Sequence, residues 1–163
     1  MIYYVKNKMV SIGDGSFVTD ENGKEHFKIQ GKWLSPTRKK FIFDAEGNQI
    51  FTVRNKFWHF MTKKALIYNA DGEKICKVKE RFFGLGFNFD DCEDDLSVDI
   101  EWGKGMLITK NGKEIGRYTW GVQNALDIFR DCFKLEVFDE SETNFLVALV
   151  IAIDNIRDQK KDK

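Results

Sequence analysis

The sequence has little proline, cysteine or histidine, and its charges of opposite sign cancel. Its 163 residues include one proline, three cysteines and two histidines, and 26 basic residues balance 26 acidic ones. With only one proline and 13 glycines, the composition excludes a collagen-like or low-complexity chain. The zero net charge argues against a generally basic nucleic-acid-binding protein. With 42% hydrophobic residues, the chain is expected to fold as one domain with a sizeable core.

The three cysteines, Cys76, Cys92 and Cys132, are far apart in the chain, and no CxxC motif occurs. This odd, scattered set predicts neither a disulfide framework nor a zinc site. Cys76 lies in a strand-like pattern and is expected to be a small core residue. The first residues lack the apolar segment of a signal peptide. We therefore expect a cytoplasmic protein with reduced cysteines.

The two histidines, His26 and His59, are too few for most catalytic or metal-binding arrangements. The motifs GxSxG, HExxH, GxGxxG and GxxxxGK[ST] are all absent from the sequence. Both histidines are expected to have structural roles. The sequence therefore predicts a protein that is not an enzyme, with no catalytic residue, cofactor or metal ligand.

The longest apolar run, Phe145–Ile153, has nine residues, well short of the roughly 20 that a membrane-spanning helix needs. Asp139 with Glu142, or Ser141, can cap a helix here. A helix that is apolar on every face must be buried on every face, which in a β-rich chain means inside a closed barrel. A long buried strand is the alternative that periodicity leaves open.

A repeat of about 24 residues runs through the first half of the chain. Matching units are Val5–Val10, Ile29–Leu34, Val53–Trp58 and Val78–Phe83. In the last three units a glycine lies nine residues before a basic residue; these pairs are Gly23/Lys32, Gly47/Lys56 and Gly72/Arg81. Each glycine follows an aspartate, as in a tight turn, and the flanking residues are β-branched or aromatic.

The repeat therefore predicts successive β-hairpins, with about 11 to 13 strands in all. Residues 122–130 can also form a short helical turn, which is left open. The domain is expected to span 1–157, including a central helix over 141–157, and a charged tail is expected over 158–163.

These features together resemble the LURP-one-related family of the Tubby C-terminal-like superfamily. The resemblance is carried by Lys8–Asp14, by the repeated hairpin units and by the ending Phe145–Asp154. It implies a closed antiparallel barrel of 12 strands around a central hydrophobic helix. Relatives in the superfamily include Tubby proteins, which bind phosphoinositide headgroups, and phospholipid scramblases, which are membrane-associated. No headgroup-binding motif can be matched here residue by residue.

Charge is distributed unevenly along the chain, with an excess of seven positive charges in residues 1–81 and seven negative charges in residues 82–163. In an up-and-down barrel alternate turns lie at opposite ends, which predicts one acidic rim and one basic rim. The basic rim is a candidate site for anionic phospholipid headgroups and comprises Arg38, Lys39, Lys40, Lys63, Lys64 and Lys104.

Other interpretations of the same residues remain open. The basic rim can be a plain solvated surface, and the barrel can be a protein-interaction scaffold with an exposed aromatic such as Trp58 as its anchor. The acidic run Asp90–Asp95 suggests Ca²⁺ binding, although a solvated acidic turn is the simpler expectation. The four tryptophans and 15 phenylalanines are expected mainly to fill the barrel.

Overall fold

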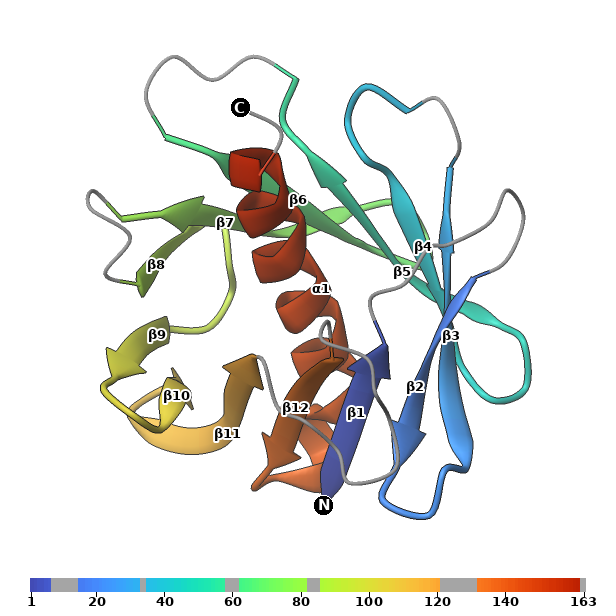
Figure 1. Ribbon diagram of the computed structural model, residues 1–163. Helices are drawn as coiled ribbons and strands as arrows, with labels where there is room; N and C mark the ends of the chain where they lie inside the picture. The colour runs from blue at the N-terminus through green and yellow to red at the C-terminus, as the bar shows by residue number, and fades with distance from the viewer. Residues whose placement is uncertain (7–14, 33–34, 58–61, 82–85, 121–131, 162–163) are drawn as a thin grey trace.

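The computed structural model describes residues 1–6, 15–32, 35–57, 62–81, 86–120 and 132–161 (Figure 1). Twelve antiparallel strands form a closed barrel in which each strand pairs with its neighbours in sequence, and β1 pairs with β12. The strands are β1 (Ile2–Lys6), β2 (Ser16–Asp20), β3 (Glu25–Gly31), β4 (Lys40–Phe43), β5 (Gln49–Asn55), β6 (Lys64–Asn69), β7 (Lys74–Glu80), β8 (Gly86–Asp90), β9 (Leu96–Glu101), β10 (Gly105–Lys110), β11 (Lys113–Trp120) and β12 (Cys132–Val137).

Three hairpins of the repeat share one turn geometry. The first turn residue, Asp20, Asp44 or Asn69, accepts a hydrogen bond from the backbone N–H of a glycine three residues later. Each glycine has a positive φ of 80° to 86°, a conformation that costs glycine little. A register shift accompanies each turn, on the strand that leads into it, between Val18 and Thr19, Ile42 and Phe43, or Ile67 and Tyr68. The repeated motif thus encodes a turn and a bulge together.

The barrel interior is made by the inward-facing residues of the strands. Burial alternates along β2, β4, β6 and β10, as expected for strands with one face toward the core. Val18, Ile42, Val53, Ile67 and Ile108 are fully buried. This alternation explains why the strands are only half hydrophobic, although the barrel encloses an apolar element.

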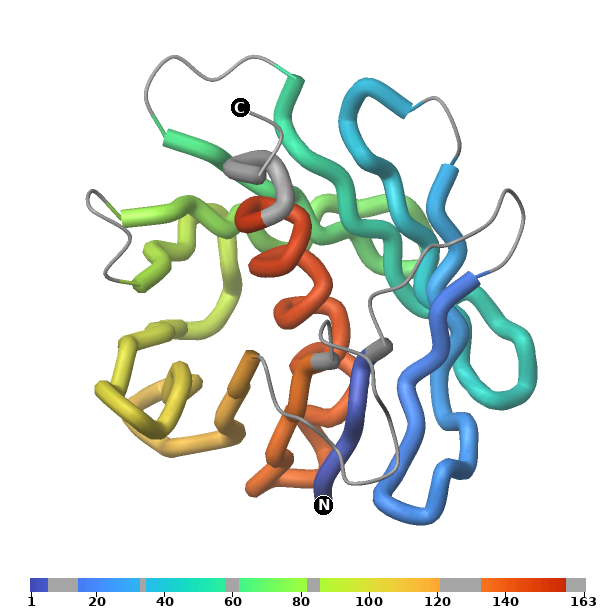
Figure 2. The backbone as a smooth tube through the Cα atoms, viewed as in Figure 1, coloured from blue at the N-terminus to red at the C-terminus, as the bar shows by residue number. Residues whose placement is uncertain are grey.

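That element is the helix α1 (Thr143–Lys161), which follows the short 3-10 helix η2 (Glu140–Glu142). Asp139 caps η2 by accepting a hydrogen bond from the backbone of Ser141. Figures 1 and 2 show α1 running through the space within the ring of strands. Every residue from Leu146 to Ile156 is buried, so the helix supplies much of the core.

The predicted fold is confirmed: a closed antiparallel barrel of 12 strands surrounds one C-terminal helix. The apolar run forms this helix and not the alternative strand. The helix begins at Thr143 and continues to Lys161, so it extends into the segment that was expected to be a tail. The possible helical turn over 122–130 lies outside the described residues.

Candidate functional site at the cationic end of the barrel

The two ends of the barrel differ in charge. One end is formed by the connections β3–β4, β5–β6, β7–β8 and β9–β10, and their described residues include seven cations and no acidic residue. We call this the cationic end; its cations are Lys32, Arg38, Lys39, Lys56, Lys63, Arg81 and Lys104. The last turns of α1 lie at the same end (Figure 1).

The connection that carries Arg38 and Lys39 is attached to the end of the helix. The side-chain amide of Asn155 donates a hydrogen bond of 3.1 Å to the backbone carbonyl of Arg38. The backbone N–H of Asn55 donates to the carbonyl of Thr37, and the Asn55 amide donates to the carbonyl of Asn155. Both asparagines are buried. The core therefore holds this part of the rim in a defined position.

Lys40 differs from the other candidate residues because its side chain lies inside the barrel. Lys40 is the first residue of β4 and is buried. Its ammonium Nζ lies 3.4 Å from a carboxylate oxygen of Asp154 on α1. A buried charge needs a partner, and Asp154 supplies one. Lys40 thus joins the barrel wall to the helix and is not on the surface of the rim.

The other candidates lie at the rim itself. Lys63 precedes β6, and its carbonyl accepts a hydrogen bond from the backbone of Glu80. Lys64 begins β6 and lies opposite Lys79 in the register. Lys104, in the turn between β9 and β10, is exposed. The structure therefore brings Arg38, Lys39, Lys63, Lys64 and Lys104 to one end, where the ammonium nitrogen of Lys63 is buried.

Aromatic side chains are exposed at this end, and Trp102 and Trp120 depart from the expectation that tryptophans mainly fill the barrel. Trp102 is 89% exposed, Phe57 is 61% exposed and Trp120 is 38% exposed. Trp102 stands in the turn between β9 and β10, beyond the ends of both strands. The ring of Trp120 stacks with the guanidinium of Arg157, at 4.1 Å from the ring centroid. Trp58, the proposed anchor, lies outside the described residues.

The opposite end, which we call the acidic end, is formed by the connections β2–β3, β4–β5, β6–β7, β8–β9, β10–β11 and β12–η2. The described residues of these connections include ten acidic residues and one cation, Lys24. The acidic residues are Glu21, Asp44, Glu46, Asp71, Glu73, Asp91, Glu93, Asp94, Asp95 and Asp139. This is the distribution that the alternation of turns predicts.

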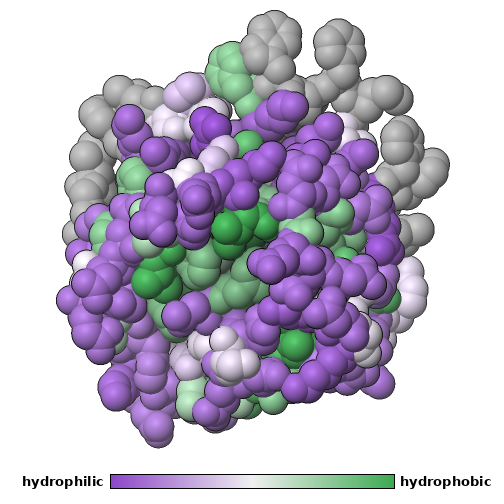
Figure 3. Space-filling view, turned by 180° about the vertical axis from the view of Figure 1, so that it is seen from behind, coloured by the Kyte–Doolittle hydropathy of each residue, from purple (hydrophilic) through white to green (hydrophobic). Residues whose placement is uncertain are grey.

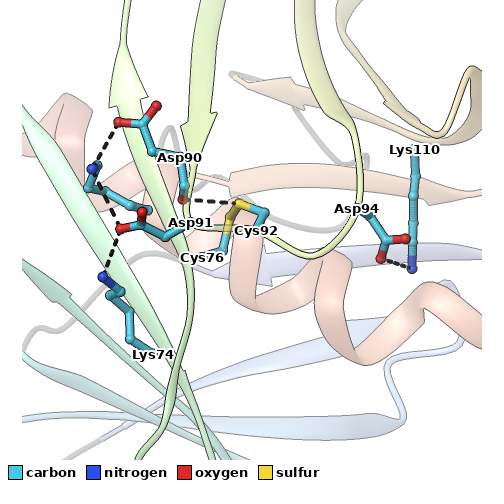
Figure 4. Close-up of a disulfide and its surroundings, with 8 residues drawn as sticks. Lys74, Cys76, Asp90, Asp91, Cys92, Asp94 and Lys110 are labelled. Carbon is cyan, nitrogen blue, oxygen red and sulfur yellow. Dashed lines mark hydrogen bonds and ion pairs between the residues drawn. A yellow bond between two sulfur atoms is a disulfide. The ribbon is translucent and has the colours of Figure 1, made fainter.

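Lysines from the neighbouring strands neutralise part of the acidic end (Figure 4). A carboxylate oxygen of Asp91 lies 2.7 Å from the ammonium nitrogen of Lys74, and one of Asp90 lies 2.9 Å from the ammonium nitrogen of Lys77. Lys110 pairs with both Asp94 and Glu142. The lysine ammonium groups lower the pKa of Asp91 and Asp94, because a nearby cation favours the charged carboxylate.

The acidic run Asp90–Asp95, which suggested Ca²⁺ binding, has several of its carboxylates ion-paired with lysines. Its carboxylates face lysines on different sides, as Figure 4 shows for Asp91 and Asp94. Within the described ranges, no three histidine, cysteine, aspartate or glutamate side chains are grouped as ligands for a metal ion. In the structure, the acidic run forms a turn whose carboxylates pair with lysines at the surface.

The cysteines correct another expectation. Cys76 and Cys92 form a disulfide, with their Cα atoms 4.4 Å apart (Figure 4). Antiparallel pairing of β7 with β8 places Lys77 opposite Asp90, which brings the two cysteines together at the next turn. The sequence shows that the two cysteines are 16 positions apart but does not show this register. The expectation of reduced cysteines is therefore wrong for Cys76 and Cys92. The cytoplasmic setting that was expected together with it loses this support.

The outer wall has a hollow on β2, β3 and β4, with a volume of about 410 Å³. Phe17 and Phe43 line it together with His26, Lys28 and Asp44. His26 is hydrogen-bonded to Asp20 at 3.0 Å, which accords with a structural role for this histidine. Hydrophobic side chains also interrupt the mainly hydrophilic surface seen from behind (Figure 3).

Comparisons with known proteins find a matching family and a solved structure of similar fold. A family model described as LURP-one-related matches residues 1–154. The chain is similar in structure to a protein from Arabidopsis thaliana solved by X-ray methods, with a TM-score of 0.62 and 14% sequence identity over 96% of this chain and 91% of that one. At this identity the likeness shows the fold alone. No curated protein matches the chain. Among the described residues, no helix is both long enough and apolar enough to cross a bilayer.

Proposed function

The chain belongs to the LURP-one-related family, and from the charge of its barrel we propose that it is a non-catalytic protein that binds anionic phospholipid headgroups through its cationic end. Attachment of this kind is peripheral, because a headgroup site requires contact with the membrane surface alone. Most of the barrel interior is occupied by α1 and the side chains around it, which favours a binding role over a catalytic one.

The observation that carries this proposal is the separation of charge between the two ends. Seven cations lie in the described connections of the cationic end, without an acidic residue among them. Near an anionic membrane each lysine or arginine contributes about 1 kcal/mol. Several such residues at one end of the barrel can therefore act together on a charged surface, whereas the acidic end would be repelled by it.

The experiment is co-sedimentation of the whole protein with vesicles of phosphatidylcholine, with and without phosphatidylserine or a phosphoinositide, at low and physiological salt. We expect binding to the anionic vesicles alone, and weaker binding as salt screens the charges. A five-site variant should lose this binding: Arg38→Gln, Lys39→Gln, Lys63→Gln, Lys64→Gln and Lys104→Gln. Lys40 is left in place because its pair with Asp154 is buried.

A matched pair of double variants separates the site from the overall charge. Lys39→Gln/Lys104→Gln removes two charges at the cationic end, and Lys24→Gln/Lys28→Gln removes two exposed lysines elsewhere. We expect the first pair to weaken binding more than the second. Equal effects, or no binding to anionic vesicles at low salt, would overturn the proposal.

A protein-interaction scaffold is the second candidate function, and the hollow on β2, β3 and β4 favours it. Phe17 and Phe43 give this hollow apolar walls, and Lys28 and Asp44 give it polar groups. An interaction site of this composition is typical of protein partners. A partner whose capture is lost with Phe43→Ala, and kept in the five-site variant, would favour the scaffold.

A further inference from the structure

From the aromatic residues at the cationic end we infer that Trp102 and Phe57 insert into the interfacial layer of the bilayer, so that the barrel binds end-on with its acidic end away from the lipid. This inference rests on the proposed function and adds to it the inserting residues and the orientation. Charge alone requires contact with headgroups, whereas insertion requires apolar side chains at the same end.

The two side chains are presented outward by different connections. Trp102 is the first residue of the three-residue connection between β9 and β10, which is closed by a hydrogen bond from Lys104 N–H to the Glu101 carbonyl. Phe57 lies in the connection between β5 and β6, next to exposed Lys56. Trp102 is 89% exposed and Phe57 is 61% exposed. Most of the surface of each residue therefore faces solvent, and Trp102 is the more exposed of the two.

Lysines accompany both aromatic residues. Lys104 is two residues from Trp102, and exposed Lys56 directly precedes Phe57. Tryptophan is enriched where hydrocarbon meets headgroups, and lysine can keep its ammonium among the headgroups while its stem covers apolar surface. The combination of an exposed ring with a nearby cation therefore fits a lipid interface in both its apolar and its polar part.

The shape of this end favours a lipid surface over a protein partner. At the cationic end the connection β7–β8 lies between the connection that carries Phe57 and the one that carries Trp102, so the two rings stand at different points of the rim. Aromatic anchors in protein interfaces fill pockets in a partner and lie close together. A bilayer can receive two separate projecting rings without matching pockets.

The opposite end supplies a matched control. Phe138 is also aromatic and is 46% exposed, but it lies beside the acidic residue Asp139. Insertion of the acidic end would bring carboxylates into contact with anionic lipid, which is unfavourable. The inference therefore predicts that Trp102 and Phe57 affect membrane binding and that Phe138 does not.

The test measures binding of Trp102→Ala, Phe57→Ala and Phe138→Ala to vesicles of phosphatidylcholine and phosphatidylserine. Removing a side chain that is buried on binding should weaken partitioning about tenfold, equivalent to ~1.4 kcal/mol. We expect this loss for Trp102→Ala, a smaller loss for Phe57→Ala, and none for Phe138→Ala. Thermal unfolding of each variant checks that the fold is intact.

A second measurement reports insertion directly. In a protein with Trp33→Phe, Trp58→Phe and Trp120→Phe, the fluorescence of Trp102 should be quenched by lipids brominated on their acyl chains. Binding to anionic vesicles without quenching, and with Trp102→Ala equal to wild type, would overturn the insertion and leave headgroup binding standing. A complete absence of vesicle binding would overturn both proposals.

Discussion

The two ends of the barrel are formed by turns of the same hairpins, but their charged residues are arranged differently. At the acidic end Lys74, Lys77 and Lys110 reach carboxylates of the turns, and a disulfide holds the turn between β8 and β9. At the cationic end the described connections contain no carboxylate. The comparison indicates that carboxylates and lysines are mixed at the acidic end, whereas the connections of the cationic end carry charge of one sign, with Arg81 paired to Asp99 on the neighbouring strand β9.

The largest effect is expected where the cationic end meets the core. Lys40→Met should lower the free energy of unfolding by about 3–5 kcal/mol, because it leaves the buried carboxylate of Asp154 without this cation. Lys40→Met/Asp154→Leu should recover most of this loss. Chemical denaturation measures both variants. An equal loss in the single and double variants would show that the ion pair does not account for the effect.

At the acidic end the disulfide should have the next largest effect. A cross-link that closes a loop of about 15 residues stabilises a protein by about 3 kcal/mol, chiefly by restricting the unfolded chain. Reduction of the Cys76–Cys92 bond should therefore lower the unfolding free energy by roughly that amount. Cys76→Ala/Cys92→Ala serves as the control, since its stability should not respond to reductant. A wild-type protein that is equally stable with and without reductant would contradict the pairing.

The acidic end should also determine how stability depends on acid. The ammonium of Lys113 and the hydrogen bonds from Ser141 lower the pKa of Asp139 from 3.8 to about 2. Because the pKa is lower in the folded state, this contribution is complete above about pH 4 and is lost as the pH falls toward 2. The melting temperature of Asp139→Asn should therefore fall less than that of wild type over this range. Parallel curves for the two proteins would be inconsistent with the lowered pKa.

The smallest effect is expected for an exposed ion pair. The side chains of Lys74 and Asp91 are 42% and 46% exposed, and exposed pairs usually contribute less than about 1 kcal/mol. Lys74→Gln should accordingly change the unfolding free energy by less than that amount, as measured by chemical denaturation. It should leave vesicle binding unchanged, because Lys74 lies at the acidic end. A change in binding as large as that of Lys39→Gln/Lys104→Gln would remove the distinction between the ends.

The parts of the site that could be predicted are those set by neighbouring residues. The turns after Asp20, Asp44 and Asn69 depend on four or five consecutive residues, so the repeat shows them directly. Alternation of these turns with the opposite set then places Arg38, Lys39, Lys63 and Lys104 at one end. The apolar run Phe145–Ile153 likewise indicates a buried helix before any contact is known.

The exposed aromatic at Trp102 could have been found in the same way. The glycines that flank Lys104 predict a turn, and a residue at the edge of a tight turn has little wall to cover it. The expectation that tryptophans fill the barrel considered residue type without the position in the hairpin. A tryptophan next to such a turn is therefore better treated as a surface residue.

The sequence by itself determined the up-and-down order of the hairpins, the apolar central helix and the charge of each end, because all of these follow from residue type and spacing along the chain. Tertiary structure alone decided that Lys40 turns inward to Asp154, 114 residues away, and that Cys76 meets Cys92. Both depend on barrel closure and strand register, and a shift of one residue would reverse the side on which each side chain lies.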